Sequence, residues 1–467
     1  MKKVVCLTLA AALVVGNSSI AFAHTPKKTL NNNVKVMKVS TQDRKAAVQI
    51  KTKEIKVKNK NIEVDLKIPV ISGLKDTKIQ SSINDKFQKQ AVEFKEQLEQ
   101  WAKEAAEDAK KYKYAMHQYQ CNTTFDVHYN KNNILSLSIA YYEYTGGAHG
   151  SYERKSYNID LNTGKEATLK DFFNEQENYK KIINEKIKKE MLKDKDTYYE
   201  EIANNFRGIK WNQPFYIEDG NIVVYFGLYE ITAYAAGIPE FKIPFSQFQE
   251  GVKTKISVEE DPIKIKTKFD EYSDKKITET YQIPVIEGMK DKKIQDKINE
   301  SIKNKIKQYK VEIEKDADKY YKEFGKDNNK GYPEYSIDVE YEVKDVYKDI
   351  LSFVITTYEY TGGAHGNTIR ETYNIDMKTG NNIKLKDLFN NGVEYKKLIN
   401  KEIENQINKN KQRYFQGDEG FKGVRDNQSY YIDNGNIVIC FGQYEIAPYS
   451  SGMPEFIIPQ SKLKINF

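Results

Sequence analysis

Hydrophobic and polar residues alternate at 62–68, and the hydrophobic residues that follow have the spacing of a helix. Residues 62–68 place apolar side chains between charged ones with a period of two, which is typical of a half-buried strand. The apolar residues that follow recur every three or four positions, which puts them on one helix face. We expect a core-packing helix, with a partner-binding or membrane helix as the alternative. The positions are Ile79, Ile83, Phe87, Ala91, Phe94, Leu98, Trp101 and Ala105.

Shorter elements are predicted beyond this helix. Alternation predicts three neighbouring strands, and a second amphipathic stretch predicts a shorter helix. Asp219-Gly220-Asn221 predicts a tight hairpin turn between two more strands. The expected fold class is therefore α+β, a mostly antiparallel sheet packed with one long and one shorter helix. The ranges are 120–129, 133–145 and 152–161 for strands, 169–173 for a helical turn and 179–192 for the shorter helix.

The whole pattern occurs twice, at an offset of 215–216 residues. Residues 141–150 and 357–366 agree at nine of ten positions, and residues 215–244 and 430–459 agree at 18 of 30. This period far exceeds the roughly 20–50 residues of solenoid and propeller repeats. The chain therefore predicts two tandem homologous domains, which we place at 47–250 and 259–467.

The first residues read as an export signal. Lys2 and Lys3 precede an apolar run, and Ala21-Phe22-Ala23 closes the segment with small residues at the spacing of a cleavage site. We expect residues 1–23 to be a removed signal peptide and residues 24–46 to be a flexible basic arm. The alternative is an uncleaved anchor, although the apolar run is short for a bilayer span. The expected location is secreted or associated with the cell envelope.

Charge argues against a nucleic-acid partner. The formal net charge of +7 for 467 residues comes entirely from the first 46 residues, so residues 47–467 are electrically balanced. Phosphate-backbone binding would need a basic surface that this body lacks. The 34 tyrosines are a more telling feature, because amphipathic rings suit binding surfaces.

Two cysteines follow the predicted signal peptide, which is too few for a disulfide scaffold. Cys440 lies in an apolar run that reads as a buried strand, and its counterpart in the first repeat is Tyr225. We expect Cys121 and Cys440 to be separate thiols, with one bridge between them as the alternative.

A glycine-rich loop with a histidine is the sharpest local motif. Three glycines in five positions let the backbone bend sharply between two strands. The functional interpretation is a ligand-contacting loop, and the structural one is a shaped loop whose histidine bonds to backbone. Because His117 and His128 correspond to Tyr332 and Lys344, we expect no metal site and no cofactor. The candidate binding residues are Tyr144, Gly146, Gly147 and His149, with Tyr360, Gly362, Gly363 and His365.

Carboxylates shared by the two repeats give an enzymatic alternative. A glycosidase needs one carboxyl group as acid and another as nucleophile or base. The sequence shows no recognisable catalytic motif, however, so we expect no enzyme. The candidates for a cell-wall glycan hydrolase or deacetylase are Glu143, Asp160, Glu230, Glu359, Asp376 and Glu445.

The order of these motifs resembles a known extracellular domain. It is similar to the domain of unknown function in RsiV-type lysozyme-sensing anti-sigma factors and PdaC-type peptidoglycan deacetylases. The shared order is a strand, a long helix, YEYTGGAHG, YNID, TG, LKD and a closing YEI and PEF. The resemblance covers roughly residues 47–467. It implies a non-enzymatic binding protein whose partner is a lysozyme-like protein or peptidoglycan glycan, with no stable membrane span after signal removal.

Overall fold

A computed structural model describes residues 47–174, 178–259, 262–324, 335–347 and 349–463. The predicted signal peptide and basic arm lie outside these described residues. In the described part of the chain, no helix is both long enough and apolar enough to cross a membrane.

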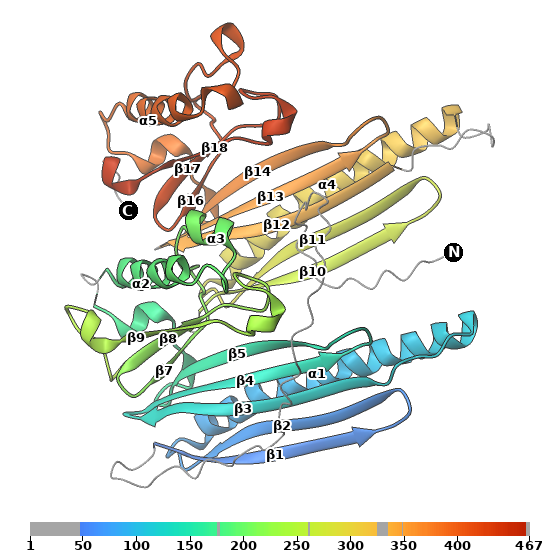
Figure 1. The fold of residues 1–467 in the computed structure, drawn as a ribbon, viewed down its shortest axis with the longest axis vertical. Helices are drawn as coiled ribbons and strands as arrows, with labels where there is room; N and C mark the ends of the chain where they lie inside the picture. Colours follow the sequence, from blue (N-terminus) through green and yellow to red (C-terminus); the bar gives the residue numbers. More distant parts are fainter. Residues whose placement is uncertain (1–46, 175–177, 260–261, 325–334, 348, 464–467) are drawn as a thin grey trace. The chain divides into compact units, whose positions relative to one another are not determined.

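Each repeat begins with a six-stranded sheet whose strands follow chain order (Figure 1). Neighbouring strands are antiparallel except β2 with β3, and β11 with β12, which are parallel because a long helix connects them. The first sheet contains β1 (Gln49–Lys58), β2 (Ile62–Ser72), β3 (Tyr119–Lys131), β4 (Ile134–Tyr144), β5 (Ser151–Asp160) and β6 (Lys165–Glu166). The second contains β10 (Lys264–Ser273), β11 (Ile277–Glu287), β12 (Tyr335–Tyr347), β13 (Ile350–Tyr360), β14 (Asn367–Asp376) and β15 (Asn381–Asn382).

One long helix packs on each sheet: α1 (Thr77–Tyr112) and α4 (Lys292–Phe324). Asp76 caps α1 by accepting hydrogen bonds from the backbone N–H of Lys78 (2.8 Å) and Ile79 (3.1 Å). The predicted apolar face is largely buried, with one correction. Trp101 is 43% exposed, because Leu98 and Ala102 occupy the core positions of that turn.

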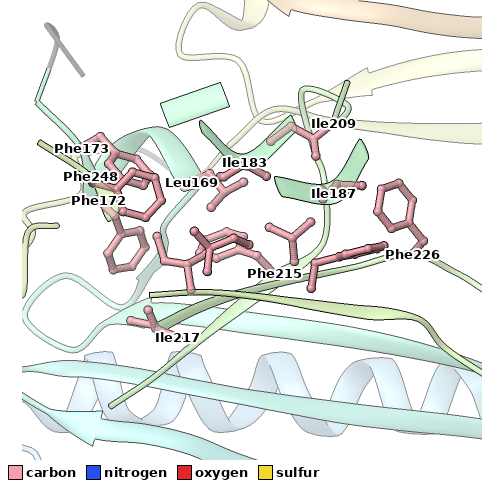
Figure 2. Close-up of a cluster of buried hydrophobic side chains, with 14 of the residues drawn as sticks. Leu169, Phe172, Phe173, Ile183, Ile187, Ile209, Phe215, Ile217, Phe226 and Phe248 are labelled. Atoms are coloured by element: carbon pink, nitrogen blue, oxygen red, sulfur yellow. The ribbon is translucent and has the colours of Figure 1, made fainter. Parts of the chain in front are cut away.

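The rest of each repeat forms a smaller unit around a three-stranded sheet. Apolar side chains of α2 pack against this sheet and the preceding helical turn (Figure 2). The first copy contains η1 (Leu169–Phe172), α2 (Tyr179–Lys193), α3 (Glu200–Asn205), β7 (Phe215–Glu218), β8 (Asn221–Tyr225) and β9 (Glu240–Pro244). The second contains η4 (Leu385–Leu388), α5 (Tyr395–Lys409), β16 (Tyr430–Asp433), β17 (Asn436–Cys440) and β18 (Glu455–Ile458).

A buried polar link joins the small sheet to the large one. The Ser136 hydroxyl donates to Asn158 Oδ1 (2.7 Å) and accepts from the backbone N–H of Ile217 (3.0 Å). Asn158 Nδ2 donates to the carbonyl of Phe215 (2.9 Å). The second repeat has the same link: Ser352 with Asn374 (2.6 Å), Ile432 with Ser352 (2.8 Å) and Asn374 with Tyr430 (2.7 Å). The asparagine of each YNID motif is therefore structural.

The α+β class with a mostly antiparallel sheet in each repeat is confirmed. Three features were not predicted: the charged edge strand β1, the parallel β2–β3 pair, and a small sheet separate from the large one. Cys121 and Cys440 are free and buried, as expected, and burial raises the pKa of each thiol to about 12. The domain boundaries stay predictions.

Polar contacts join the two repeats: Lys180 lies 3.7 Å from Asp345, Lys264 lies 3.3 Å from Glu166, and Arg207 contacts three residues of the second repeat. Arg207 Nη1 donates to the Tyr431 hydroxyl (3.2 Å). The same guanidinium lies 3.6 Å from the carboxylate of Asp433 and 3.7 Å from that of Glu455.

Candidate functional site

The glycine-rich loop connects β4 to β5, and its conformation depends on its glycines. Gly146 and Gly147 have φ of 112° and 95°, and their counterparts Gly362 and Gly363 have φ of 99° and 102°. These values lie in the region that side chains rarely adopt. The last glycine is constrained by space, because a Cβ on Gly150 would lie 2.5 Å from the Glu143 carbonyl.

Tyrosine hydroxyls hold the loop from within. Tyr144 donates to the carbonyl of Gly147 (3.0 Å), and Tyr360 donates to that of Gly363 (3.1 Å). The predicted residues of each motif thus form one shaped loop, identical in both repeats.

The histidine of each loop stacks on a tyrosine from the small unit. The ring of His149 lies 3.9 Å from that of Tyr234 at an interplanar angle of 20°, while His149 Nδ1 donates to the carbonyl of Gly150 (2.9 Å). Tyr234 donates its hydroxyl to the same carbonyl (2.8 Å). His365 and Tyr449 repeat the stack at 4.2 Å and 25°. Loop and small unit therefore meet through these rings.

A second tyrosine extends each stack toward solvent. The ring of Tyr229 lies 5.7 Å from that of Tyr234, and Tyr444 lies 5.7 Å from Tyr449. We call Tyr229, Tyr234 and His149 the first aromatic ladder, and Tyr444, Tyr449 and His365 the second. Burial and the neighbouring phenols raise the pKa of Tyr234.

The outer tyrosines have a strained backbone. Tyr229 (φ 62°) is 54% exposed, and Tyr444 (φ 61°) is 55% exposed. A bulky residue in this region costs about 1–3 kcal/mol, and such strain concentrates at functional sites. Each tyrosine is the third residue of a turn closed by a backbone hydrogen bond, Glu230 N–H to the Gly227 carbonyl (3.3 Å) and Glu445 N–H to the Gly442 carbonyl (3.3 Å), so the turn holds the positive φ while the residue stays more than half exposed.

The predicted carboxylates Glu230 and Glu445 maintain these turns. Glu230 Oε2 accepts from the backbone N–H of Gly227 (2.8 Å), and its Oε1 pairs with Lys210 (2.6 Å). Glu445 does the same with Gly442 (2.8 Å) and Arg425 (2.8 Å). These groups therefore position the outer tyrosines.

Asp160 and Asp376 lie far from the ladders. Glu143 pairs with Ser151 at one end of β5, and Asp160 is at the other end, which is about 30 Å away at about 3.3 Å per residue. Asp160 accepts hydrogen bonds from the backbone N–H groups of Asn162 (2.9 Å) and Val258 (3.0 Å). Asp376 similarly accepts from Lys378 (2.7 Å). The structure therefore does not bring Glu143 and Asp160 together as an acid–base pair.

Glu143 and Glu359 are half-buried at the end of the strand that precedes each loop. Burial raises the pKa of both carboxyl groups. Among the described residues, no group of three or more histidine, cysteine, aspartate or glutamate side chains has the geometry to hold a metal ion.

Sequence reasoning missed the tyrosines of the ladders. Tyr229 and Tyr444 stand at equivalent positions of the YEI segments, as do Tyr234 and Tyr449 five residues later. Their identity in both repeats was a visible signal. Their exposure, and the stacking on a histidine about 80 residues away in the chain, require the fold.

Comparison with known proteins identifies the architecture. The family described as Deacetylase PdaC matches residues 55–152 and 270–368. The family described as Protein of unknown function (DUF3298) matches residues 170–246 and 386–461. The chain therefore contains two tandem copies of a PdaC domain followed by a DUF3298 domain. Each ladder takes its histidine from the first segment and its tyrosines from the second.

Two curated relatives come from Bacillus subtilis (strain 168). The anti-sigma-V factor RsiV is 28% identical over 200 residues, which cover 41% of this chain and 66% of RsiV. The peptidoglycan-N-acetylmuramic acid deacetylase PdaC is 26% identical over 132 residues, which cover 27% of this chain and 28% of PdaC. The matches thus span less than two thirds of each relative's length.

Two solved structures are also similar. A DUF3298 family member from Bacteroides fragilis NCTC 9343 has 22% identity and a TM-score of 0.37, covering 45% of this chain and 96% of that chain. A DUF3298 family protein from Pseudomonas aeruginosa PAO1 has 17% identity and a TM-score of 0.32, covering 46% of this chain and 99% of that chain.

Proposed function

We propose that this chain is a secreted or cell-envelope binding protein without catalytic activity, whose aromatic ladders contact a lysozyme-like protein or cell-wall glycan. The observation that carries the proposal is the pair of outer tyrosines. Both are more than half exposed and both have a strained positive φ. A bulky residue that a fixed turn presents to solvent at a costly φ, at the same place in both repeats, is suited to contact a partner.

The chemistry of the ladder suits either partner. A tyrosine ring offers a large apolar face at low entropy cost and keeps a hydroxyl for hydrogen bonding. Such a ring packs on the apolar face of a sugar or fills the substrate cleft of a glycan-cleaving enzyme. One relative supports a role at the cell wall, since it is a peptidoglycan-N-acetylmuramic acid deacetylase.

The enzymatic alternative keeps one supporting observation. Burial raises the pKa of Glu143 and Glu359, which is a property of catalytic acids. Turnover of peptidoglycan, measured as released reducing ends or acetate, distinguishes the two. Turnover that is lost in Glu143→Gln/Glu359→Gln with unchanged melting temperature would establish the enzyme and overturn the binding proposal.

A capture experiment tests the proposal. The purified chain is incubated separately with immobilised lysozyme and with peptidoglycan sacculi, and bound protein is quantified. We expect capture by one of them, and a loss of about tenfold or more in affinity for Tyr229→Ala/Tyr444→Ala, the scale of a contact hot spot. The matched control is Tyr112→Ala/Tyr114→Ala, which removes two tyrosines that are 59% and 52% exposed at the end of α1. Capture by neither target would overturn the proposal.

A further inference from the structure

A cavity of about 300 Å³ lies in the second repeat, where the start of β14 meets the end of β17 and the turn that carries Tyr444. Its wall includes Gln443 and Glu445, the two neighbours of Tyr444 in the chain. Two lining residues of the cavity are therefore the chain neighbours of the outer tyrosine of the second ladder. The other lining residues are Asn367, Thr368, Ile369, Arg370, Arg425, Ser429, Cys440, Phe441 and Gly442.

The first repeat fills the equivalent space with a tyrosine. Tyr225 stands where the second repeat has Cys440, and only 1% of its surface is exposed. Its hydroxyl donates to the carbonyl of Arg154 (3.1 Å), and the Arg154 guanidinium carbon lies 5.4 Å from its ring centroid. Replacing such a ring with a thiol leaves the volume of the ring unoccupied.

Three other lining positions change in the same direction, whereas Asn367 and Ile369 stand where the first repeat has the smaller Ser151 and the charged Glu153. Where the second repeat has Thr368, Ser429 and Gln443, the first has Tyr152, Pro214 and Leu228. Bulky or apolar residues are thus replaced by small or polar ones. The Gln443 amide is fixed at the wall, because its Oε1 accepts from the backbone N–H of Thr368 (3.1 Å).

The charges at the cavity are balanced. Arg425 pairs with Glu445 (2.8 Å), and Arg370 pairs with Glu455 (2.6 Å). Glu455 also faces Arg207, which in turn faces Asp433. An ionic ligand would have to break one of these pairs, whereas an uncharged ligand uses their donors and acceptors as they stand.

We propose that this cavity binds one uncharged sugar ring of cell-wall glycan, such as an N-acetylglucosamine unit. The inference rests on the proposed function and deepens it by naming the ligand of the second repeat. The volume is at the lower end of ligand pockets, which suits a single ring. Hydroxyl, amide and paired charged groups line it, and this combination satisfies the hydroxyl groups of a sugar. The next sugar of the chain then passes Tyr444.

The test is a titration of the isotope-labelled chain with N-acetylglucosamine and its trimer, followed by NMR. We expect saturable shifts at residues 367–370 and 440–445 and none at the equivalent residues 151–154 and 225–230. Gln443→Leu, which installs the residue of the first repeat, is expected to weaken binding about fivefold or more. Leu228→Gln is the matched control, and it should leave the affinity unchanged.

Cys440→Tyr gives the sharper variant, because it installs the side chain that fills the first repeat. We expect it to abolish the shifts with a retained cooperative melt, and Gln443→Leu carries the test if the variant does not fold. Absence of shifts with the wild type, or equal affinity of wild type and Gln443→Leu, overturns the cavity proposal. Tighter binding of N-acetylmuramic acid than of N-acetylglucosamine also overturns it, since a carboxylate would then be preferred. The capture experiment judges the proposed function separately.

Discussion

The two repeats have the same aromatic ladder, but the residues near it differ in size. His149 with Tyr234 and His365 with Tyr449 stack in nearly the same geometry. Behind them, the first repeat buries Tyr225 and the second has Cys440 and a cavity. A duplicated domain can thus keep one surface unchanged while one copy replaces a buried side chain with a smaller one and leaves a cavity. Under the proposals above, the two copies share a mode of contact but not a ligand.

Glycine substitutions should disturb both repeats most. Gly150→Val and Gly366→Val place a Cβ 2.5 Å from the carbonyls of Glu143 and Glu359. We expect each variant to lose about 3 kcal/mol or more of unfolding free energy, because backbone cannot move aside cheaply. Denaturant titration measures the loss.

Gly147→Val and Gly363→Val provide the comparison for these variants. No atom lies within 4 Å of either added Cβ, but both positions have positive φ. Their cost should be smaller, about 1–3 kcal/mol. A Gly150→Val protein as stable as the wild type would show that the loop is not built as described.

The buried asparagines should matter next, and equally in both repeats. Asn158→Ala and Asn374→Ala each remove the acceptor and donor that link the small sheet to the large one. We expect a loss of about 1–3 kcal/mol each, because Ser136 or Ser352 is left with an unsatisfied buried hydroxyl. Calorimetric melts check this, and strongly unequal losses would break the equivalence of the repeats.

A pH effect should separate the repeats. Glu279 in β11 is buried where the first repeat has Val64, and burial raises its pKa above 4.5 although Lys310 lies 3.0 Å away. Asp270 and Glu314 also face this pair and oppose the charged form of Glu279.

The folded protein therefore binds a proton more tightly there than the unfolded chain. Stability is favoured below pH 4.5 and falls as the pH rises through the raised pKa. Glu279→Gln should remove that part of the pH dependence in denaturant titrations from pH 4 to 7. Lys95→Met, at the position in the first repeat that corresponds to Lys310, is the control and should leave it in place.

The smallest effect should come from the histidines. His149→Asn/His365→Asn removes two ring stacks, each contributing about 0.5–1.5 kcal/mol, so the protein should fold with a slightly lower Tm. Capture by lysozyme or sacculi should weaken less than with Tyr229→Ala/Tyr444→Ala. If the histidine variant binds as poorly as the tyrosine variant, the contact with the partner is made by the loop and not by the outer tyrosine alone.

The elements of the fold were predictable where a periodic pattern was strong. The apolar faces of α1 and α4 and the strands around the glycine-rich loop follow directly from spacing. Strand β1 was not predicted because polar and charged residues outnumber apolar ones on both of its faces, as an exposed edge strand allows. The parallel β2–β3 pair was missed because pairing direction leaves no mark in local periodicity.

The candidate site was predictable only in part, for a related reason. The loop motif stands out in the sequence because positive φ requires glycine. The only sequence signal at Tyr229 and Tyr444 is their identity in both repeats, because an aromatic residue before Glu-Ile otherwise reads as an ordinary core position. The role of Glu230 as a turn acceptor also depends on a hydrogen bond to Gly227 that no spacing predicts.

The ladder has a consequence for how this architecture is divided. Its histidine belongs to the PdaC segment and its tyrosines to the DUF3298 segment. A cut between residues 152 and 170 would separate His149 from Tyr234, so the loop would lose the ring it stacks on and Tyr234 would lose the histidine beneath it. In this chain the two segments are therefore halves of one module, and an exchange of segments must carry both halves to preserve the ladder.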